Sequence, residues 1–399
     1  MRPCPILKFL RKQTKQNMVF TGRITHLSQK GLGVVKNEQD GVSYFVFGTW
    51  PGDEGEFAII DRPLNNKKYG YAKLVQLTHP SNARQQAPCP YLGNHQNACS
   101  GCPWMIADYT SQLEQKRNRF LYAMQRTGFD TSILSIPPVH GSPEQYGYRN
   151  RFQVKTDGHQ LGFVTEGSHH IAPIQDCLVL NTTCRSLLKT INQSLPNSAW
   201  QPSAGYEWNF IDLDDDLPFD QIKPNQKRPF KQGNHTQNTW IKSWLSKQLQ
   251  ANPTLHNVIE LFCGSGNFTE VIADSACHQI IAYEASFDAI QQLRARNLPK
   301  VDARPVDLFK PFIWKILRKA ISDADTLVLD PPRAGLKNMT GFFEHFLALR
   351  TIYYISCDPE SFARDAWHFT KKGWTLTEIQ LVDLFPHTSH VETLAVLKK

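Results

Sequence analysis

The chain has 399 residues, of which 41% are hydrophobic and 20% charged, and its formal net charge is +8. That length exceeds one ordinary core and predicts two or three domains. No apolar run approaches the roughly 20 residues needed to span a bilayer, so we expect a globular protein with no membrane partner. The positive charge favours an acidic partner, with nucleic acid the first candidate.

Residues 1–18 form a basic segment with no acidic side chain. The segment lacks a long apolar core and a small-residue cleavage site, so it does not resemble a secretion signal. We therefore expect a cytoplasmic protein. In that compartment the nine cysteines of the chain are not expected to form a disulfide scaffold.

Residues 19–80 predict a small β-barrel of the oligonucleotide-binding type. Short β-prone segments at 19–24, 33–35, 44–47 and 56–60 alternate with glycine-containing turns, as in such barrels. Lysines interleaved with two tyrosines offer phosphate contacts and a stacking face for RNA: these are Lys36, Lys67, Lys68, Lys73, Tyr69 and Tyr71. The alternative for any single lysine is a solvated barrel surface.

Residues 81–230 predict a central, β-rich domain that begins with a cysteine cluster. Residues 107–126 have helical periodicity, with a possible apolar stripe made by Tyr109, Leu113, Phe120, Leu121 and Met124. Further along, the acidic residues 212–216 give way to a basic stretch at 223–231.

Residues 231–399 alternate between helical and strand patterns. A helix is expected at 240–249, and strands at 258–262, 280–283, 326–329, 351–355 and 393–397. Such alternation indicates βαβ units in a doubly wound, mostly parallel α/β sheet.

A glycine-rich turn follows the first of these strands. Gly264-x-Gly266 lets the backbone approach a nucleotide, and Glu284 lies about twenty residues further on, where an acid accepts hydrogen bonds from a ribose. Asp307, after a third strand, is placed to reach an adenine amino group. Either acid alone is better explained as a helix N-cap, but together they favour an adenosine cofactor.

Two strand ends carry reactive side chains. Asp330 begins an Asp-Pro-Pro-Arg turn, and Cys357 directly follows the apolar run 351–355. In open α/β sheets ligands bind at the carboxyl ends of strands, and backbone N–H groups of the following turn are expected to lower the pKa of this thiol. The alternatives are a capping aspartate and a buried, inert cysteine. Glu392, in His390-Val391-Glu392, is an acid–base candidate or an exposed edge residue.

Four cysteines form a second candidate site. Cys99-x-x-Cys102, with Cys89 and the distant Cys177, supplies four thiolates, which suit tetrahedral zinc or an iron–sulfur cluster. The ligand count does not separate these two. The Cys-x3-Cys-x2-Cys pattern of radical-SAM enzymes is absent from the sequence.

These motifs together resemble a known family, the SAM-dependent RNA uracil-C5 methyltransferases of the iron–sulfur branch, which make 5-methyluridine in 23S ribosomal or in transfer RNA. The resemblance covers most of the chain. It includes a TRAM-like barrel and extends over Tyr148-Arg149-Asn150-Arg151, Phe230-x-Gln232-x-Asn234, residues 262–267, Asp330-Pro331-Pro332-Arg333, Ser356-Cys357 and His390-Val391-Glu392.

The resemblance implies roles for individual residues. Cys357 is the implied nucleophile and Glu392 the base. The implied SAM and uridine sites are lined by Gln232, Phe262, Asn267, Glu284, Asp307 and Asp330. Cys89, Cys99, Cys102 and Cys177 match the family's four-iron, four-sulfur ligands, which favours the cluster over zinc. Two departures stand out: Asp358 replaces an expected asparagine, and the gap between Cys89 and Cys99 is long.

The chemistry fits the residues. Carbon 5 of uracil is too weak a nucleophile until a thiolate adds at carbon 6, and a base must then remove the carbon 5 proton. The target uridine must be splayed out of its stack. Arg149 and Arg151 are candidates for holding the refolded RNA strand, with structural ion pairs as the alternative.

We therefore expect uracil-C5 methylation of RNA, with ribosomal RNA favoured over transfer RNA, by a monomer without an obligate protein partner. The rivals are RNA cytosine-C5 methylation, which Ser356-Cys357 disfavours because those enzymes usually carry Pro-Cys, and a non-catalytic RNA-binding, cluster-carrying protein.

Overall fold

The computed structural model describes residues 18–61, 69–93, 95, 97–165, 168, 170–337, 339 and 341–399. They fall into two compact units. Unit 1 holds the described residues of Met1–Gln115, Glu144–Arg228 and Phe385–Ser389, and unit 2 those of Lys116–Pro143, Pro229–Leu384 and His390–Lys399. The expected domain boundaries at 19–80, 81–230 and 231–399 stay predictions. Most of the basic N-terminal segment, together with Lys67 and Lys68, lies outside the described residues.

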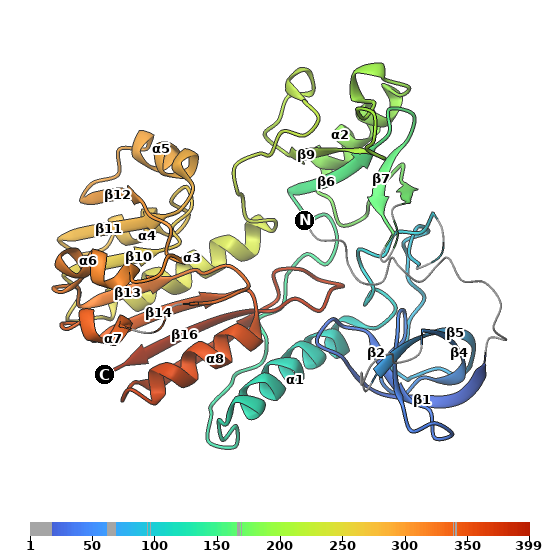
Figure 1. Cartoon of the computed structure of the whole chain (residues 1–399), viewed down its shortest axis with the longest axis horizontal. Coiled ribbons are helices and arrows are strands. Elements are labelled where there is room, and N and C mark those ends of the chain that lie inside the picture. The colour runs from blue at the N-terminus through green and yellow to red at the C-terminus, as the bar shows by residue number, and fades with distance from the viewer. Residues whose placement is uncertain are drawn as a thin grey trace. The chain divides into compact units, whose positions relative to one another are not determined.

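In unit 1, five strands close into a barrel in the order β1-β2-β3-β5-β4 (Figure 1). The strands are β1 (Val19–Leu27), β2 (Gly33–Lys36), β3 (Ser43–Val46), β4 (Glu54–Asp61) and β5 (Tyr69–His79). Side chains that alternate along each strand point inward, and Phe20, Tyr44 and Phe57 fill the interior. On the same alternation, Tyr69 and Phe45 come from the outer face, with ring centroids 4.9 Å apart. The predicted barrel is therefore present, with β5 as a strand that the sequence patterns had not delimited.

A second sheet in unit 1 contains four antiparallel strands in the order β8-β7-β6-β9. They are β6 (Arg151–Thr156), β7 (Leu161–Val164), β8 (Ile171–Pro173) and β9 (Asn209–Asp214). Helix α2 (Thr182–Gln193) shares one apolar core with this sheet, to which Val154, Leu188 and Ile211 contribute. The β-rich character expected for this region is confirmed.

Unit 2 contains a seven-stranded sheet in the order β12-β11-β10-β13-β14-β16-β15. Five strands are parallel: β10 (Asn257–Leu261), β11 (Gln279–Glu284), β12 (Val301–Pro305), β13 (Thr326–Leu329) and β14 (Thr351–Ser356). The edge pair β15 (Thr375–Val382) and β16 (Glu392–Lys398) runs antiparallel. Strands β13 and β14 are buried along their whole length, as expected for a sheet covered on both faces. The doubly wound α/β class is confirmed.

Helices cover this sheet on both faces. They are α3 (His235–Gln250), α4 (Thr269–Ala273), α5 (Phe287–Ala295), α6 (Ile313–Ile321), α7 (Phe342–His345) and α8 (Pro359–Thr370). Because parallel crossovers are right-handed, α4 and α5 lie on the opposite face from α6 and α7. Helix α8 packs along β14, β15 and β16 (Figure 1). None of the described helices is long and apolar enough to cross a membrane.

Helix α1 (Tyr109–Thr127) confirms the helix expected at 107–126 but corrects its buried face. Phe120 and Met124 are buried as predicted, but Lys116, one turn earlier, is fully buried as well. Its ammonium pairs with the buried carboxylate of Asp383 in unit 2. A periodicity that counts only apolar residues misses this position, because a lysine is buried only where a partner is supplied by tertiary structure.

Candidate active site

The glycine-rich turn begins where β10 ends. Phe262 takes a left-handed conformation with a φ of 65°, and Gly264 and Gly266 have φ values of 55° and 94°. A Cβ at Gly266 would lie 2.5 Å from the Leu293 side chain, so this position requires glycine for space as well as for conformation. The turn therefore brings the backbone close to helix α5 and presents its amides at the carboxyl edge of the sheet.

Glu284 stabilises that turn from the end of β11. Its Oε2 accepts a hydrogen bond from the Gly264 amide (3.3 Å), and its Oε1 accepts one from the Ser286 amide (2.9 Å). The N-cap of α5 is Ser286. The alternative reading of Glu284 as a helix cap is therefore wrong. The carboxylate is half-buried next to the turn, as a ribose-binding acid would be.

The loop after β12 brings Asp307 next to an aromatic wall. Asp307 Oδ1 accepts a hydrogen bond from the Phe309 amide (3.0 Å), and the Phe309 ring centroid lies 5.7 Å from that of Phe262. On Phe309 also lies the Lys337 ammonium, 4.6 Å from the ring centroid. Phe309 and Lys337 were missed from the sequence because their contact joins two loops far apart in the chain.

Asn267 and Gln232 lie near the start of α3. Asn267 exchanges two amide hydrogen bonds with Asn238 of α3, at 2.9 and 3.0 Å. Gln232 is half-buried in the segment that leads to the α3 N-cap, Asn234. Asn234 is itself fully buried and donates to the Leu384 carbonyl (3.2 Å). This bond fixes the segment that carries Gln232 to the chain that precedes β16.

The three reactive candidates stand at the ends of three adjacent strands. Asp330 follows the last residue of β13, Cys357 follows the last residue of β14, and Glu392 begins β16. In the β14–β16 ladder Ser356 pairs with Thr393. Continuing that antiparallel register by one residue places Cys357 opposite Glu392, where Cα atoms are about 4.5–5.5 Å apart. Glu392 is therefore neither exposed nor on a free edge: it is 6% exposed.

The electrostatics of this cluster correct one expectation. Burial, reinforced by Glu392 and Asp330, raises the pKa of the Cys357 thiol to about 12. The turn after β14 was expected to lower that pKa, so that prediction is wrong for this structure. Burial beside two acids outweighs the backbone amides, because a thiolate here adds a like charge in a low-dielectric place.

The two acids are also shifted. Burial, with a contribution from Asp330, raises the pKa of Glu392 to about 8. Burial, with a contribution from Glu284, raises the pKa of Asp330 to about 7. Strongly shifted groups that cluster at a strand-end edge are typical of catalytic sites. The cluster favours bound positive charge, which would relieve all of these shifts.

Asp358 and Pro359 have a local structural role. Asp358 is the N-cap of α8 and accepts from the Ser361 amide at 2.9 Å, with Pro359 in the first turn. Its carboxylate also lies 3.5 Å from Arg119. Asp358 raises the pKa of Cys357, as its negative charge predicts, but it is the weakest of the named causes.

The turn that carries Asp330 is held from below by α8. Asp365 Oδ2 accepts hydrogen bonds from the Tyr354 hydroxyl and the Leu336 amide, both at 2.7 Å. Gly335 has a φ of 65°, and a Cβ there would lie 2.4 Å from Asp365. The turn is therefore fixed to β14 and α8 together.

A buried acid within β10 was not singled out from the sequence. Glu260 is 1% exposed and accepts a hydrogen bond from the Thr269 hydroxyl at 2.6 Å. Burial raises its pKa to about 8, with a further contribution from Asp330. The available signal was a carboxylate inside an otherwise apolar strand.

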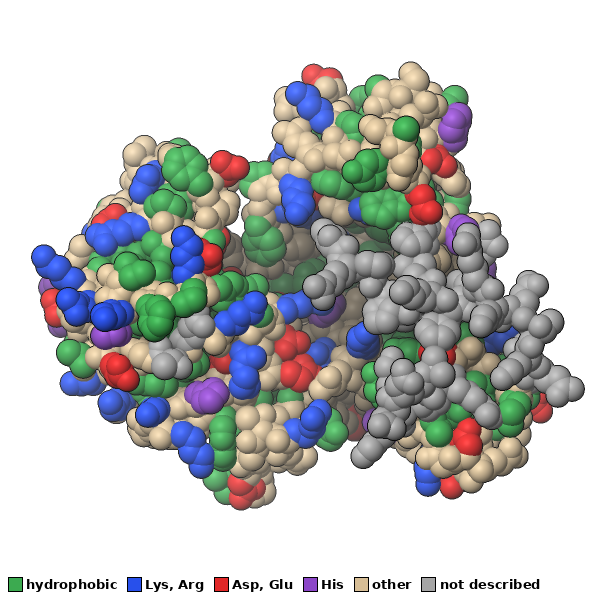
Figure 2. Space-filling model, in the orientation of Figure 1, with side chains coloured by type: hydrophobic (Ala, Val, Ile, Leu, Met, Phe, Trp, Pro, Cys, Tyr) green, Lys and Arg blue, Asp and Glu red, His purple; other side chains and the backbone are tan. Residues whose placement is uncertain are grey.

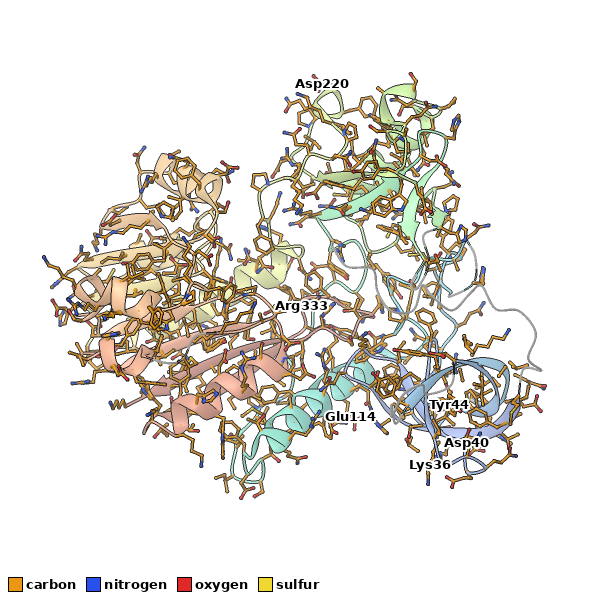
Figure 3. All side chains as sticks on the ribbon, viewed as in Figure 1. Lys36, Asp40, Tyr44, Glu114, Asp220 and Arg333 are labelled. Carbon is orange, nitrogen blue, oxygen red and sulfur yellow. The ribbon has the colours of Figure 1, made fainter. Side chains whose placement is uncertain are left out.

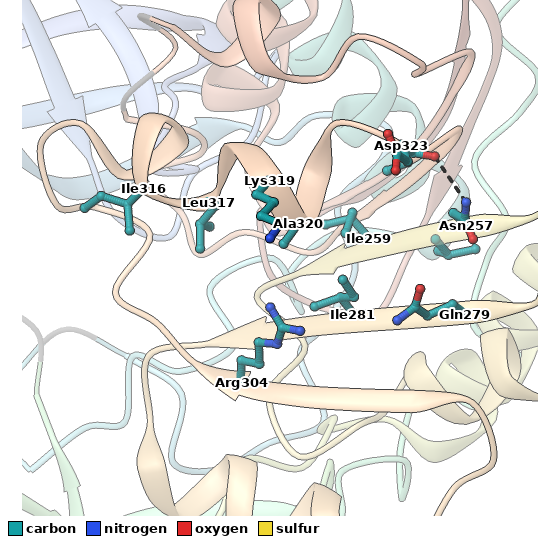
Figure 4. Close-up of a pocket in the computed structure, with 12 residues that line it drawn as sticks. Asn257, Ile259, Gln279, Ile281, Arg304, Ile316, Leu317, Lys319, Ala320 and Asp323 are labelled. Carbon is teal, nitrogen blue, oxygen red and sulfur yellow. Dashed lines mark hydrogen bonds between the residues drawn. The ribbon is translucent and has the colours of Figure 1, made fainter.

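The largest pocket described in unit 2 lies elsewhere. It measures about 500 Å³ and lies between α6 and the sheet, lined by residues such as Ile259, Ile281, Arg304 and Leu317 (Figure 4). Asn257 and Gln279, the first residues of β10 and β11, also line it. None of the predicted site residues lines it, so it is not the expected cofactor site.

The four cysteines gather in unit 1. They are half-buried, unbonded to one another, and Cys89, Cys102 and Cys177 contact the cluster of Met105, Tyr148 and Val179. Burial raises the pKa of Cys99 to about 11, and Cys177 and Cys89 reinforce the shift, so the thiols interact. As the side chains of the described residues stand, no three potential ligands are arranged to hold a metal ion. The donor type fits a metal or cluster, but the spacing is not that of a preformed cage.

The arginines of Tyr148-Arg149-Asn150-Arg151 make intramolecular contacts. Arg151 donates to Asp212 Oδ2 (2.7 Å) and to the Arg228 carbonyl (2.9 Å). Arg149 donates to the Arg151 carbonyl (2.9 Å) and lies 5.5 Å from the Phe385 ring. The structural alternative is therefore realised, and the acidic stretch near Asp212 serves these pairs.

Comparison with known proteins places this geometry. A family model described as tRNA (Uracil-5-)-methyltransferase matches residues 317–399, which carry Asp330, Cys357 and Glu392. An uncharacterized RNA methyltransferase of Nitrosomonas europaea is 61% identical over 382 residues, covering 96% of this chain and 97% of the relative. The chain belongs to the SAM-dependent RNA uracil-C5 methyltransferase family.

Two further similarities span the methyltransferase. The 23S rRNA (uracil(1939)-C(5))-methyltransferase RlmD of Dechloromonas aromatica is 26% identical over 443 residues, covering 94% of this chain and 99% of that one. The solved tRNA (uracil-54, C5)-methyltransferase of Pyrococcus abyssi, in complex with S-adenosyl-L-homocysteine, is 21% identical with a TM-score of 0.66. That likeness covers 95% of this chain and all of the other, and it supports the fold of the methyltransferase.

Proposed function

We propose that this enzyme transfers a methyl group from SAM to carbon 5 of one uridine in 23S ribosomal RNA, through a covalent bond between Cys357 and the uracil. The observation that carries the proposal is the convergence of Asp330, Cys357 and Glu392 on the ends of three adjacent strands. The RlmD relatives support a ribosomal substrate, since six of them match 94–96% of the chain.

The cofactor site in this proposal runs along the same edge. Glu284 would bind the ribose, Asp307 the adenine amino group, and Phe262, Asn267 and Gln232 would line the methionine and uracil side. SAM supplies an electrophilic methyl group on a positively charged sulfur. The residues fit such a cation, because Asp330, Glu284 and Glu392 surround the site with acids whose shifted pKa values favour a positive neighbour.

The residues then divide the chemistry as follows. Cys357 Sγ loses its proton and bonds to carbon 6 of the uracil, which moves electron density onto carbon 5 and the carbonyl oxygen. Carbon 5 takes the methyl group, and Glu392 removes the remaining proton from carbon 5. Elimination breaks the bond between sulfur and carbon 6 and restores the aromatic ring. Asp330 is placed to bond the uracil edge or the cofactor amine.

The high pKa of Cys357 imposes an order on these events. At neutral pH the free enzyme holds a thiol, since its pKa is about 12. A positively charged ligand lowers that value, so thiolate addition is expected only after the cofactor is bound. Requiring the cofactor first also protects Cys357 from reaction with other electrophiles.

RNA contacts in the proposal come from both units. In unit 1 the outer aromatic side chains Phe45, Tyr69 and Tyr71 of the barrel offer stacking surfaces for bases. Lysine and arginine side chains are spread over the faces seen in Figure 2 rather than confined to one patch. This distribution suits an RNA that is held at many phosphates.

Cys89, Cys99, Cys102 and Cys177 are proposed as ligands of a four-iron, four-sulfur cluster. The support is their mutual interaction in one half-buried group of free thiols. No catalytic step is assigned to the cluster. The cytoplasmic location and the monomeric state stay predictions.

The test is methyl transfer from labelled SAM to total RNA taken from cells that lack the protein, followed by fractionation and nucleoside analysis. Label in 5-methyluridine of 23S RNA is the expected result. Label in transfer RNA would overturn the proposed substrate, and label in 5-methylcytidine would overturn the proposed reaction.

A further inference from the structure

Two polar side chains outside the proposed catalytic pair connect the ends of β13 and β16. Arg333 lies three residues after Asp330, and His390 lies two residues before Glu392. Arg333 Nη2 is 3.1 Å from His390 Nε2. Both residues belong to unit 2, and Figure 3 shows Arg333 at the edge of the sheet where the reactive residues lie.

The path of this bond follows from the strand order. Strands β13 and β16 are not neighbours, because β14 lies between them. A hydrogen bond from the turn after β13 to the chain entering β16 therefore crosses the end of β14. The residue at that end is Cys357. The bond joins the segment of Asp330 to the segment of Glu392 across the thiol.

The chemistry of the bond fixes the state of the imidazole. A guanidinium has N–H donors and no acceptor, so His390 Nε2 must accept. The ring is therefore neutral, with its proton on Nδ1. Arg333 also brings a positive charge to the cluster, and that charge lowers the pKa of both Cys357 and Glu392 against the dominant effect of burial.

The bond connects anchored segments. On one side Arg364 Nη2 donates to the Ala334 carbonyl (2.8 Å), next to Arg333. On the other side Val391 and Glu392 are buried at the start of β16. Because each end is fixed to the sheet or to α8, a single exposed hydrogen bond can set the distance between them. An isolated surface contact would contribute little to stability.

We propose that Arg333 and His390 form a clasp across the end of β14, and that both are positioning residues for the methylation by Cys357 and Glu392. This inference rests on the proposed function. The clasp holds the turn of Asp330 and the base Glu392 at a constant spacing on either side of the thiol. It also retains one cation among three acids, where the substrate uracil must develop negative charge.

Steady-state kinetics of paired variants test the positioning. Arg333→Met removes the donor and the charge with a similar side-chain length, and His390→Ala removes the acceptor. We expect each to lower kcat on the methylated RNA about tenfold or more, while the Kd for SAM, measured by calorimetry, stays within about twofold. The double variant should be no slower than the slower single variant, since coupled residues are not additive.

Conservative variants sharpen this test. His390→Gln keeps an acceptor oxygen for Arg333 and should recover most of the kcat lost in His390→Ala. Additive losses in the double variant, or equal losses in the glutamine and alanine variants, would overturn the clasp. A loss confined to SAM affinity would also overturn it.

A spectroscopic measurement reports on the bond without RNA. In protein labelled with ¹⁵N-histidine, the His390 ring, assigned by its disappearance in His390→Gln, should carry its proton on Nδ1 at neutral pH. The Arg333→Met substitution should shift the ¹⁵N signal of Nε2. A ring protonated on Nε2, or a signal insensitive to Arg333→Met, would refute the clasp. A wild-type enzyme that methylates no RNA would refute the proposed function instead, and the ring signals would still decide whether the clasp forms.

Discussion

Cys357 lies opposite Glu392 across the end of the β14–β16 ladder, one residue beyond the pair Ser356 and Thr393. This relationship joins a proposed nucleophile and a proposed base that are 35 residues apart in the sequence. Strand β16 runs antiparallel to β14, so its first residue meets the carboxyl edge where the parallel strands end. A parallel seventh strand would have placed Glu392 at the other edge of the sheet.

Replacing Cys357 by alanine should reduce methyl transfer by at least about a thousandfold, because no carbon nucleophile forms without the thiolate. SAM binding should be unchanged within about twofold, since the thiol makes no proposed contact with the adenosine. The measurement is label transfer alongside calorimetry. Cys277→Ala removes another buried thiol of unit 2 and serves as the control. Full activity in Cys357→Ala would disprove the covalent mechanism.

Glu392→Gln should allow addition and methylation but block loss of the carbon 5 proton. A covalent protein–RNA species should therefore accumulate and appear as a slowly migrating band on a denaturing gel. The double variant with Cys357→Ala is the control and should give no band. If the glutamine variant turns over normally without an adduct, Glu392 is not the base.

The rate of the wild-type enzyme should rise with pH. Burial, with Asp330, raises the pKa of Glu392 to about 8 in the free protein, and a general base must be deprotonated to act. We expect kcat/KM to increase from pH 6 and to level off above about pH 8. A pH profile on RNA of constant structure checks this. A flat profile across that window would contradict the assignment of the shifted group.

Glu260→Gln should change how stability depends on pH. The folded-state pKa of Glu260 is raised to about 8, so its contribution to stability is complete below its unfolded pKa and is lost as pH rises through about 8. That loss is on the order of 2–3 kcal/mol between pH 6 and 9. Denaturant unfolding should show a smaller loss in the variant, and Glu344→Gln, at an exposed site, should match the wild type. Equal slopes in all three proteins would refute the prediction.

Lys116→Met should destabilise unit 2 by about 3–5 kcal/mol, because it leaves the buried Asp383 carboxylate without its cation. The double variant Lys116→Met with Asp383→Leu should regain part of that loss, since both charges are then removed. Thermal unfolding at one protein concentration measures the effect. Lys315→Met, at an exposed position of α6, is the matched control. A loss in Lys116→Met no greater than in this control would show that the pair contributes nothing.

Cys102→Ser should lower the iron and acid-labile sulfide that copurify with the anaerobically prepared protein, in proportion to the loss of one of four thiolate ligands. Cys184→Ser changes a buried cysteine of the α2 core and should leave both contents unchanged. Zinc in stoichiometric amount with no sulfide would favour the tetrahedral zinc alternative. Wild-type protein with neither metal would contradict the proposed cluster.

Local patterns in the sequence determined most of the fold. Apolar runs such as residues 326–329 and 351–355 became fully buried strands, because a short β-prone run between turns has few other low-energy conformations. Gly264, Gly266 and Gly335 marked turns, since their positive φ values are costly for other residues. The order of the motifs placed Cys357 and Asp330 at strand ends before any tertiary contact was known.

Tertiary structure alone decided the charge states and the partnerships. A strand pattern does not reveal that Glu392 is buried beside Cys357, so the direction of the thiol pKa shift was wrong when judged from the turn alone. The Lys116–Asp383 pair and the Arg333–His390 bond join residues that are far apart in the chain. Burial and the distance between charges depend on how elements pack, and these are the quantities that set pKa values and make ion pairs. The sequence therefore named the reactive side chains, and the packing determined how they interact.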